Sequence, residues 1–264
     1  PAPLPADPGP HAQTVADALL SGERKAVLLG NAAARHPQAS ALLAVANFIG
    51  QHTGASVGYF VEGGNAVGAQ LVKALPGVGG LNAGQMLAQP MKALLLLNTE
   101  PVADAADAAA AKAALAGSGL VVAFTAFKDG ELAEHADVML PIAPFTETGG
   151  SFVNAEGRLQ AFHGVAKPLG ETRPGWKVLR VLGNLLGLPG FDFETVEDVR
   201  AEALGDAAAL AARLDNGSSA APAFAPAPQG LQRVAAVPVY ATDMLVRRAP
   251  SLQATADAAM PVVG

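Results

Sequence analysis

The sequence predicts an α/β protein with a mostly parallel, doubly wound sheet. Two observations lead to this prediction: short apolar runs alternate with helix-forming stretches, and the connections between them are short. Such a sheet is covered by helices on both faces and binds ligands at the carboxyl ends of its strands. The apolar runs that we expect to form strands are residues 25–29, 56–61, 92–97, 120–124 and 138–141.

Helices are expected between and after these strands. Residues 39–49 and 104–116 are rich in alanine and leucine, which favour the helical conformation. Residues 176–186 place tryptophan and leucine side chains along one face of a helix. The stretch 195–213 opens with Thr-x-x-Asp, which resembles the capping box at the start of a helix. We expect these last two helices to close the domain.

We expect three parts along the chain: an α/β domain over residues 1–213, a flexible linker over 214–236 and an extended segment over 237–264. The linker runs from Asn-Gly-Ser-Ser into alternating alanine and proline, a composition that cannot bury a core. The last segment is too short to fold alone, so we expect it to lie on this domain or on another one. The sequence opens with Pro-Ala-Pro-Leu-Pro, which is typical of a cut end rather than of a signal peptide.

The composition excludes several kinds of chemistry. The chain has 264 residues and no cysteine, which excludes cysteine-ligated iron–sulfur clusters, thiolate zinc sites and cysteine nucleophiles within it. It has 17 Lys and Arg against 23 Asp and Glu, without basic clusters, so we expect no nucleic-acid partner. Hydrophobic residues make up 51%, but polar residues and glycines interrupt the longest uncharged stretch, residues 36–61, so we expect no direct membrane insertion.

Several short motifs resemble known sites without completing them. Residues 63–68 have the outer spacing of a P-loop, but Ala69 and Gln70 replace the lysine and hydroxyl residue that contact phosphate and magnesium. The five histidines are widely spaced, which predicts no metal site. Asp104 and Asp107 lie three residues apart on an expected helix, and we interpret them as structural carboxylates that face water.

The densest group of polar residues follows the last predicted strand, over residues 145–160. It contains the carboxylates of Glu147 and Glu156, the amide of Asn154 and the guanidinium of Arg158 together with three glycines. Its position after a strand of a parallel sheet is where such sheets bind ligands. The residues alone leave two interpretations open. One is a ligand site, and the other is a tight turn in which Glu156 pairs with Arg158 while Asn154 and the glycines shape the backbone.

The same segment resembles a characteristic sequence of the molybdopterin oxidoreductase family. The resemblance lies in Ala-Asp-Val-Met-Leu-Pro at residues 136–141 and in Glu-x-Gly-Gly-Ser-Phe-x-Asn-x-Glu-Gly-Arg-x-Gln at 147–160. Three further segments are similar to the family: residues 28–33, 63–68 and 96–101. The similarity covers about residues 20–190, with a weaker echo over 240–253.

Within the family, residues 28–33 and 147–163 are most similar to the large iron–sulfur subunits of bacterial NADH:quinone oxidoreductases, the respiratory complex I. This resemblance implies iron–sulfur clusters in an N-terminal part of the parent subunit and no cofactor in this chain. It implies partners among the other subunits of the peripheral arm of complex I. It also implies a peripheral location on the cytoplasmic side of the bacterial inner membrane.

In relatives that use the pterin cofactor, such loops lie close to it, so the resemblance implies a vestigial pterin pocket. The residues that we expect near this pocket are Asn65, Glu147, Asn154, Glu156 and Arg158. We expect no catalytic residue and no metal ligand in this chain.

The leading hypothesis for function is therefore a cofactor-free structural scaffold, inactive when isolated, within a complex that transfers electrons from NADH to quinone. The alternative is part of a molybdenum-dependent, formate dehydrogenase-like enzyme whose loop 147–160 contacts a pterin guanine dinucleotide. In that alternative Arg158 neutralises pyrophosphate, while Asn65 and Asn154 bond the pterin edge. A free-standing nucleotide-binding protein is the third hypothesis.

Overall fold

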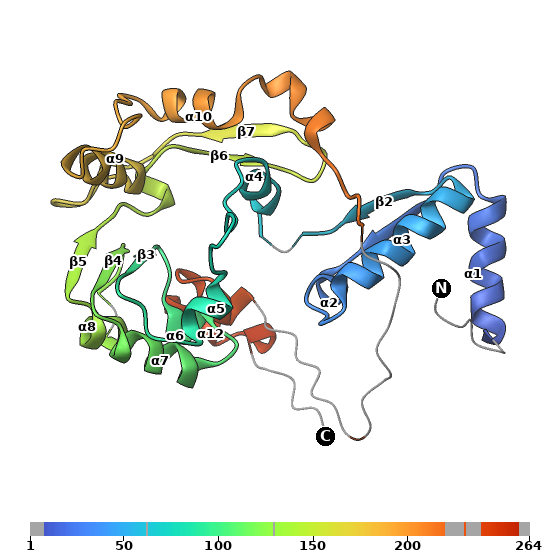
Figure 1. The fold of residues 1–264 in the computed structure, drawn as a ribbon, viewed down its shortest axis with the longest axis horizontal. Helices are drawn as coiled ribbons and strands as arrows, with labels where there is room; N and C mark the ends of the chain where they lie inside the picture. Colours follow the sequence, from blue (N-terminus) through green and yellow to red (C-terminus); the bar gives the residue numbers. More distant parts are fainter. Residues whose placement is uncertain (1–7, 62, 129, 220–229, 231–238, 259–264) are drawn as a thin grey trace. The chain divides into compact units, whose positions relative to one another are not determined.

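The computed structural model describes residues 8–61, 63–128, 130–219, 230 and 239–258 (Figure 1). Helices and strands alternate along these residues, and strands pair in parallel, which confirms the predicted α/β class. The chain divides into two compact units, each made from three stretches of sequence. Unit 1 comprises residues 1–73, 152–160 and 204–234, and unit 2 comprises residues 74–151, 161–203 and 235–264.

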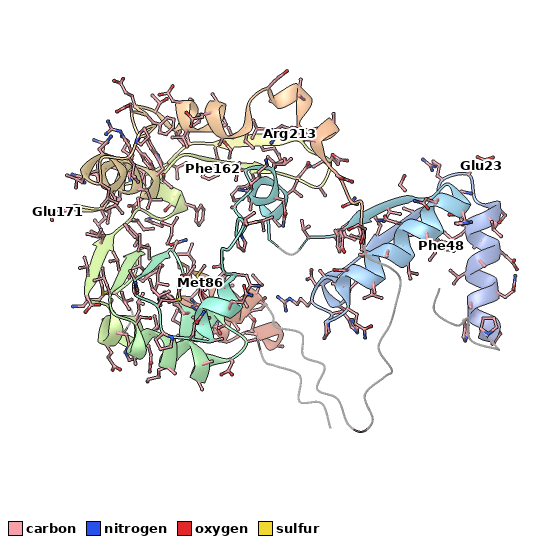
Figure 2. The ribbon with its side chains drawn as sticks, in the orientation of Figure 1. Glu23, Phe48, Met86, Phe162, Glu171 and Arg213 are labelled. Carbon is pink, nitrogen blue, oxygen red and sulfur yellow. The ribbon has the colours of Figure 1, made fainter. Side chains whose placement is uncertain are left out.

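Unit 1 is built on a two-stranded parallel sheet of β1 (Ala26–Leu29) and β2 (Ser56–Tyr59). Helix α3 (Ala39–Thr53) connects the two strands and packs against both. Its Phe48 side chain is exposed and lies beside His52, with 4.0 Å between the ring centroids (Figure 2). Further helices described in this unit are α1 (Gly9–Ser21), α2 (Asn31–Ala34), α4 (Ala66–Leu71), η2 (Ala207–Ala209) and η3 (Ala211–Arg213).

Unit 2 is built on a three-stranded parallel sheet. Its strands lie in the order β3 (Leu94–Leu97), β4 (Val121–Thr125), β5 (Val138–Pro141). Its described helices before the C-terminal segment are α5 (Ala83–Leu87), α6 (Pro101–Asp104), α7 (Ala108–Gly117), α8 (Gly130–His135), η1 (Phe145–Glu147), α9 (Gly175–Leu185) and α10 (Val196–Leu204). The last residue of α10, Leu204, is the first residue of the third stretch of unit 1. The five predicted strands therefore belong to two small sheets, one in each unit, rather than to the single sheet that we expected.

The largest buried cluster of unit 2 lies on one face of its sheet, while Phe124 of β4 is buried on the other face. Leu94 and Leu96 of β3 are buried together with Leu115 of α7 and Leu132 of α8. The alternate side chains of the same strand, Leu95 and Leu97, are exposed. Our expectation that this strand is buried between two helix layers is therefore wrong for β3, because only one of its faces packs against the described core.

The two longest predicted helices are shorter in the structure. The stretch 104–116 is divided between α6 and α7, and the Asp107 side chain caps α7 by accepting a hydrogen bond of 2.9 Å from the Ala110 amide. The capping box at Thr195 and Asp198 is confirmed, with reciprocal bonds of 2.9 and 3.1 Å between each backbone amide and the other side chain. The helix that it starts, α10, ends at Leu204 rather than near Arg213.

A hairpin of β6 (Gly150–Val153) and β7 (Leu159–Phe162) forms where the sequence predicted only a polar excursion (Figure 1). The end of β6 and the start of β7 contribute to the core of unit 1. That core consists of the buried residues Val153, Leu204 and Leu210, against which Val67, Leu71 and Leu159 pack. The polar segment therefore has a structural role in addition to any role at a site.

The C-terminal segment forms short helical turns where the sequence predicted an extended chain. These are α11 (Val239–Thr242), η4 (Val246–Arg248), α12 (Pro250–Gln253) and η5 (Ala256–Ala258). Most of the predicted linker lies outside the described residues, as do residues 237–238 and 259–264. The boundaries of the three predicted parts stay a prediction. None of the described helices has the length and apolar character needed to cross a membrane.

Candidate functional site

The turn of the β6–β7 hairpin is organised by Asn154. Its side-chain Oδ1 accepts hydrogen bonds from the backbone amides of Glu156, at 3.0 Å, and Arg158, at 2.9 Å. Its backbone accepts a bond from the Gly157 amide at 3.0 Å. Gly157 has φ +80°, and a Cβ at this position would lie 2.6 Å from the backbone of Ala211, so both the turn and the close approach require glycine. Asn154 is therefore a turn-forming residue, the structural alternative left open by the sequence.

Asn65 connects the start of α4 to this hairpin. Its side-chain Oδ1 accepts a hydrogen bond of 2.9 Å from the backbone amide of Val153. A Cβ on Gly68 would lie 2.1 Å from the same oxygen, so the glycine makes room for the Asn65 side chain. The two asparagines expected at a pterin pocket thus lie on neighbouring elements of unit 1, and each uses its amide oxygen to hold the backbone in place.

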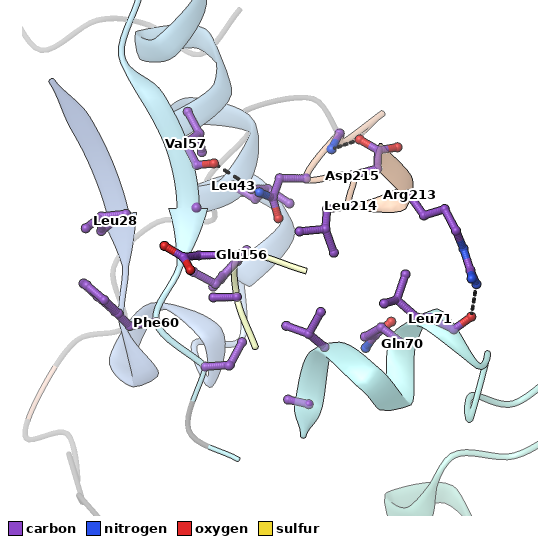
Figure 3. Close-up of a pocket in the computed structure, with 18 residues that line it drawn as sticks. Leu28, Leu43, Val57, Phe60, Gln70, Leu71, Glu156, Arg213, Leu214 and Asp215 are labelled. Atoms are coloured by element: carbon purple, nitrogen blue, oxygen red, sulfur yellow. Dashed lines mark hydrogen bonds between the residues drawn. The ribbon is translucent and has the colours of Figure 1, made fainter. Parts of the chain in front are cut away.

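A cavity of about 780 Å³ opens beside these elements, within unit 1 (Figure 3). Its apolar lining includes Leu28 and Val57 of the sheet and Leu71 of α4. Its polar lining includes Gln70 of α4, Glu156 of the hairpin turn, Arg213 of η3, and Asp215 and Asn216 of the chain that follows. Such a cavity, largely apolar with a few polar groups, has the character of a small-molecule site.

The one arginine described in the cavity lining is already engaged. Arg213 lies beside α4 (Figure 2), and it donates hydrogen bonds to the backbone carbonyls of Leu204, at 2.6 Å, and Leu71, at 2.9 Å. Two carboxylates, those of Glu156 and Asp215, line the same cavity. Because an anionic group would meet these two carboxylates, the charges of the cavity favour a neutral or cationic ligand over a phosphate.

The cavity wall is completed by residues that the sequence analysis assigned to the linker. The Asn216 side chain donates a bond of 3.1 Å to the Val57 carbonyl (Figure 3). The Asn47 side chain donates one of 2.9 Å to the Asn216 carbonyl. Asp215 and Asn216 were missed as site residues, because a polar Asp-Asn-Gly-Ser sequence is typical of a turn or linker. Arg213 was missed as well, although it lies in the predicted α/β domain. Nothing in the sequence signalled that this stretch returns to β2.

The other three expected site residues do not all belong to the same unit. Glu156 is exposed and lines the cavity, while Arg158 is exposed and is not among its lining residues. Among the described residues these two side chains form no ion pair with one another. Glu147 belongs to unit 2, where its Oε2 accepts a bond of 3.1 Å from the Leu169 amide. The structure therefore brings Asn65, Asn154 and Glu156 to one part of unit 1.

Comparison with known proteins identifies the family. Residues 11–185 match the description "Molybdopterin oxidoreductase", which is more than half of the chain. The chain belongs to the molybdopterin oxidoreductase family. The parallel sheets and the β6–β7 hairpin therefore belong to a molybdopterin oxidoreductase domain.

Individual relatives match over shorter stretches. The "Probable oxidoreductase YjgC" of Bacillus subtilis (strain 168) is 42% identical over 71 residues, 27% of this chain and 7% of that protein. The "Putative formate dehydrogenase" of Staphylococcus aureus (strain bovine RF122 / ET3-1) is 46% identical over 55 residues, 21% of this chain and 6% of that protein. The matched segments therefore span only a small part of these much longer relatives.

The family implies a pterin cofactor, and the charges of the cavity do not suit the pyrophosphate of such a group. The amide oxygens of Asn65 and Asn154 already accept bonds from the protein's own backbone, so these two side chains would meet a pterin edge mainly through their NH2 groups. A pyrophosphate in the cavity would face two carboxylates and an arginine whose guanidinium is bonded to carbonyls. No chemical step of this cofactor is therefore assigned to the described residues of unit 1.

Proposed function

We propose that this chain is the cofactor-free α/β portion of a larger oxidoreductase and contributes structure rather than redox chemistry. The observation that carries the proposal is the role of Asn65 and Asn154. Their amide oxygens accept backbone hydrogen bonds within the β6–β7 hairpin and between the hairpin and α4. The absence of cysteine from the sequence supports it, because an iron–sulfur cluster or a thiolate ligand to molybdenum needs that side chain.

For the parent enzyme we propose a subunit of NADH:quinone oxidoreductase. The support is the likeness of residues 28–33 and 147–163 to the large iron–sulfur subunits of that complex. In this proposal the clusters lie in an N-terminal part of the parent subunit, the partners are other subunits of the peripheral arm, and the location is peripheral on the cytoplasmic side of the inner membrane. This chain would support the cluster-bearing region and offer surface to its neighbours.

A second candidate is a molybdenum-dependent, formate dehydrogenase-like enzyme. The names of the Staphylococcus aureus relatives favour it, although the matched stretches are short. In that candidate a pterin would be held mainly by other parts of the parent protein, because the amide oxygens of Asn65 and Asn154 already accept backbone bonds.

The cofactor-free role is tested by cofactor content. We would express the full 264-residue chain in a host that makes molybdenum cofactor and supply molybdate and iron. The expected result is no bound pterin in the oxidised-pterin fluorescence assay, and no molybdenum or iron by mass spectrometry above the level of the spent buffer. Stoichiometric pterin in the purified chain would overturn the proposal.

The two parent enzymes are separated by the electron donor. The complete parent protein, purified with its native partners, would be assayed for reduction of an artificial acceptor by NADH and by formate. NADH-dependent reduction without formate activity supports the NADH:quinone oxidoreductase. Formate-dependent reduction that needs molybdate in the growth medium supports the second candidate.

A further inference from the structure

The carboxylate of Glu100 is the most deeply buried charged group described in unit 2. Its side chain is only 5% exposed, and it follows β3 closely, at the carboxyl edge where parallel sheets bind their ligands. A buried carboxylate requires a paired cation and hydrogen bonds, since an isolated one is strongly disfavoured. Its partners come from the C-terminal segment, more than a hundred residues further along the chain.

Two consecutive arginines supply the positive charge. Arg248 donates a hydrogen bond of 3.0 Å from Nη1 to Oε2 of Glu100, and its Nη2 lies 2.7 Å from Oε1 as an ion pair. Arg247 bonds to Oε2 of Glu100 through Nη2, and to Oδ1 of Asp104 through Nη1 at 2.7 Å. The other oxygen of Asp104 accepts a bond of 2.7 Å from the Glu100 amide. Two carboxylates thus balance two guanidinium groups in one hydrogen-bonded cluster.

The cluster is largely shielded from solvent. The Arg247 and Arg248 side chains are 14% and 27% exposed. Burial lowers the pKa of the Arg247 guanidinium, but hydrogen bonds to Asp104 and Glu100 outweigh this effect, so the pKa is raised and the side chain stays charged. The Arg248 guanidinium lies 4.6 Å from the ring centroid of Phe127, a cation–π contact on its remaining side.

The segment that carries these arginines, residues 239–258, is organised by its own hydrogen bonds. We call it the C-terminal module. The Asp243 carboxylate accepts bonds of 2.9 Å from the amides of Leu245 and Val246. The Gln253 side chain donates bonds to the carbonyls of Tyr240, at 3.0 Å, and Val246, at 2.9 Å, which tie α12 to α11 and η4. Hydrogen bonds within the C-terminal module therefore hold the backbone on which the two arginines lie.

Charge, rather than apolar burial, anchors the C-terminal module. Helices α11, η4 and α12 contain no fully buried side chain among their described residues. Leu245 and Val246 are only partly buried. Since no side chain of these helices is fully buried, we attribute the specific attachment of the module chiefly to the two guanidinium groups.

We propose that Glu100, Asp104 and Phe127 form a receptor site for a paired-arginine peptide, and that the C-terminal module is a separable ligand that occupies it. The site lies at the ligand-binding edge of the β3–β4–β5 sheet. Its ligand class is a peptide with two adjacent arginines, presented as in residues 239–258. This site is independent of the cavity in unit 1 and of the proposed structural role.

The test keeps the full chain and cuts it after folding. A recognition sequence for a site-specific protease is inserted between residues 224 and 225, outside the described part of the chain, and the purified protein is cleaved. We expect the C-terminal fragment to co-elute with the rest in gel filtration at low ionic strength. Separation of the fragments under these conditions would overturn the proposal.

Exchange of a labelled peptide measures the role of each charge. A fluorescent synthetic peptide of residues 239–258 is added to the cleaved protein, and anisotropy reports its uptake. Arg248→Gln in the peptide should weaken binding by about 30-fold or more, because it leaves part of the Glu100 carboxylate unpaired. Arg247→Gln should weaken binding similarly. Equal affinity of the two variant peptides and the original peptide would contradict the proposal.

Changes on the receptor side complete the test. Glu100→Gln in the cleaved protein should reduce peptide uptake by about 30-fold or more. The matched control is Glu131→Gln, which removes an exposed ion pair with Lys112 in the same unit and should leave uptake unchanged. The peptide variants keep the test decisive if Glu100→Gln fails to fold, because they do not alter the rest of the chain.

Discussion

Two groups of acidic and basic side chains in this chain behave in opposite ways. Glu156 and Arg158 are two residues apart in sequence, lie on one hairpin turn and are both exposed, without a mutual ion pair in the described structure. Glu100 and Arg247 are far apart in sequence, yet they meet in a shielded cluster. Proximity along the chain therefore did not identify the pair with the greater energetic weight.

The difference follows from solvation. An exposed ion pair gains little, because water already solvates both charges and ordering two long side chains costs entropy. A buried carboxylate has lost its water, so removing its partner leaves a strongly unfavourable charge. Substitutions in the two groups test this contrast between buried and exposed charges.

Glu100→Ala should lower the free energy of unfolding by about 3–5 kcal/mol, because it removes the buried carboxylate that pairs with both shielded arginines, Arg247 and Arg248. Urea denaturation followed by circular dichroism measures this change. The control Glu131→Ala breaks an ion pair whose side chains are 48% and 50% exposed, and its effect should stay below about 1 kcal/mol. Similar losses in the two variants would remove the distinction between the clusters.

Gly157→Ala should destabilise unit 1 by about 2 kcal/mol or more. The substitution places a side chain at φ +80°, and its Cβ would approach the Ala211 backbone to 2.6 Å. Gly170→Ala is the matched control, since Gly170 also has a positive φ, +58°, but nothing lies within 4 Å of its added Cβ. The difference between the two thermal unfolding midpoints isolates the contact from the backbone strain.

Much of the local structure could be predicted from the sequence. The five apolar runs became β1 to β5, with boundaries shifted by two residues or fewer, because buried parallel strands leave a strong apolar signal. The capping box at Thr195 could also be predicted, since both partners lie within four residues. The hairpin of β6 and β7 was missed, because its glycines and polar residues resemble those of a loop.

The long-range contacts could not be predicted in the same way. The two bonds that join Asn216 to β2 and α3, and the bonds of Arg247 and Arg248 to Glu100, link residues that lie 147 to 169 positions apart in the sequence. Neither set of bonds leaves a pattern in the nearby sequence, because each depends on which distant parts of the chain meet in the folded structure. Asp104 illustrates this point: it was interpreted as a carboxylate facing water, and it binds Arg247.

Asn154→Ala should destabilise the hairpin by about 1–3 kcal/mol, because two backbone amides of the turn lose their acceptor. Asn154→Asp is the conservative control, since a carboxylate oxygen can accept the same two bonds. Hydrogen exchange of the Glu156 and Arg158 amides should accelerate in the alanine variant and stay slow in the aspartate variant. Equal exchange in both variants would show that the side chain does not hold the turn.

Asp198 is an exposed carboxylate whose hydrogen bonds give it a small, pH-dependent role. Hydrogen bonding from the side chain and backbone of Thr195 lowers the pKa of this carboxyl group. A lowered folded-state pKa means that its contribution to stability is present at neutral pH and is lost as the pH falls through that lowered pKa. In Thr195→Ala the pKa should rise toward its ordinary value, which carboxyl carbon NMR titration measures. An unchanged titration would contradict the capping interaction.

The smallest effect is expected at Arg158. Its side chain is exposed and makes no ion pair with Glu156 in the described structure, so Arg158→Ala should change the free energy of unfolding by less than about 0.5 kcal/mol. The double variant with Glu156→Ala should equal the sum of the single changes, because two side chains that do not interact have no coupling energy. A measurable coupling between them in urea denaturation would mean that the pair forms in solution, and the contrast with the Glu100 cluster would then be one of burial alone.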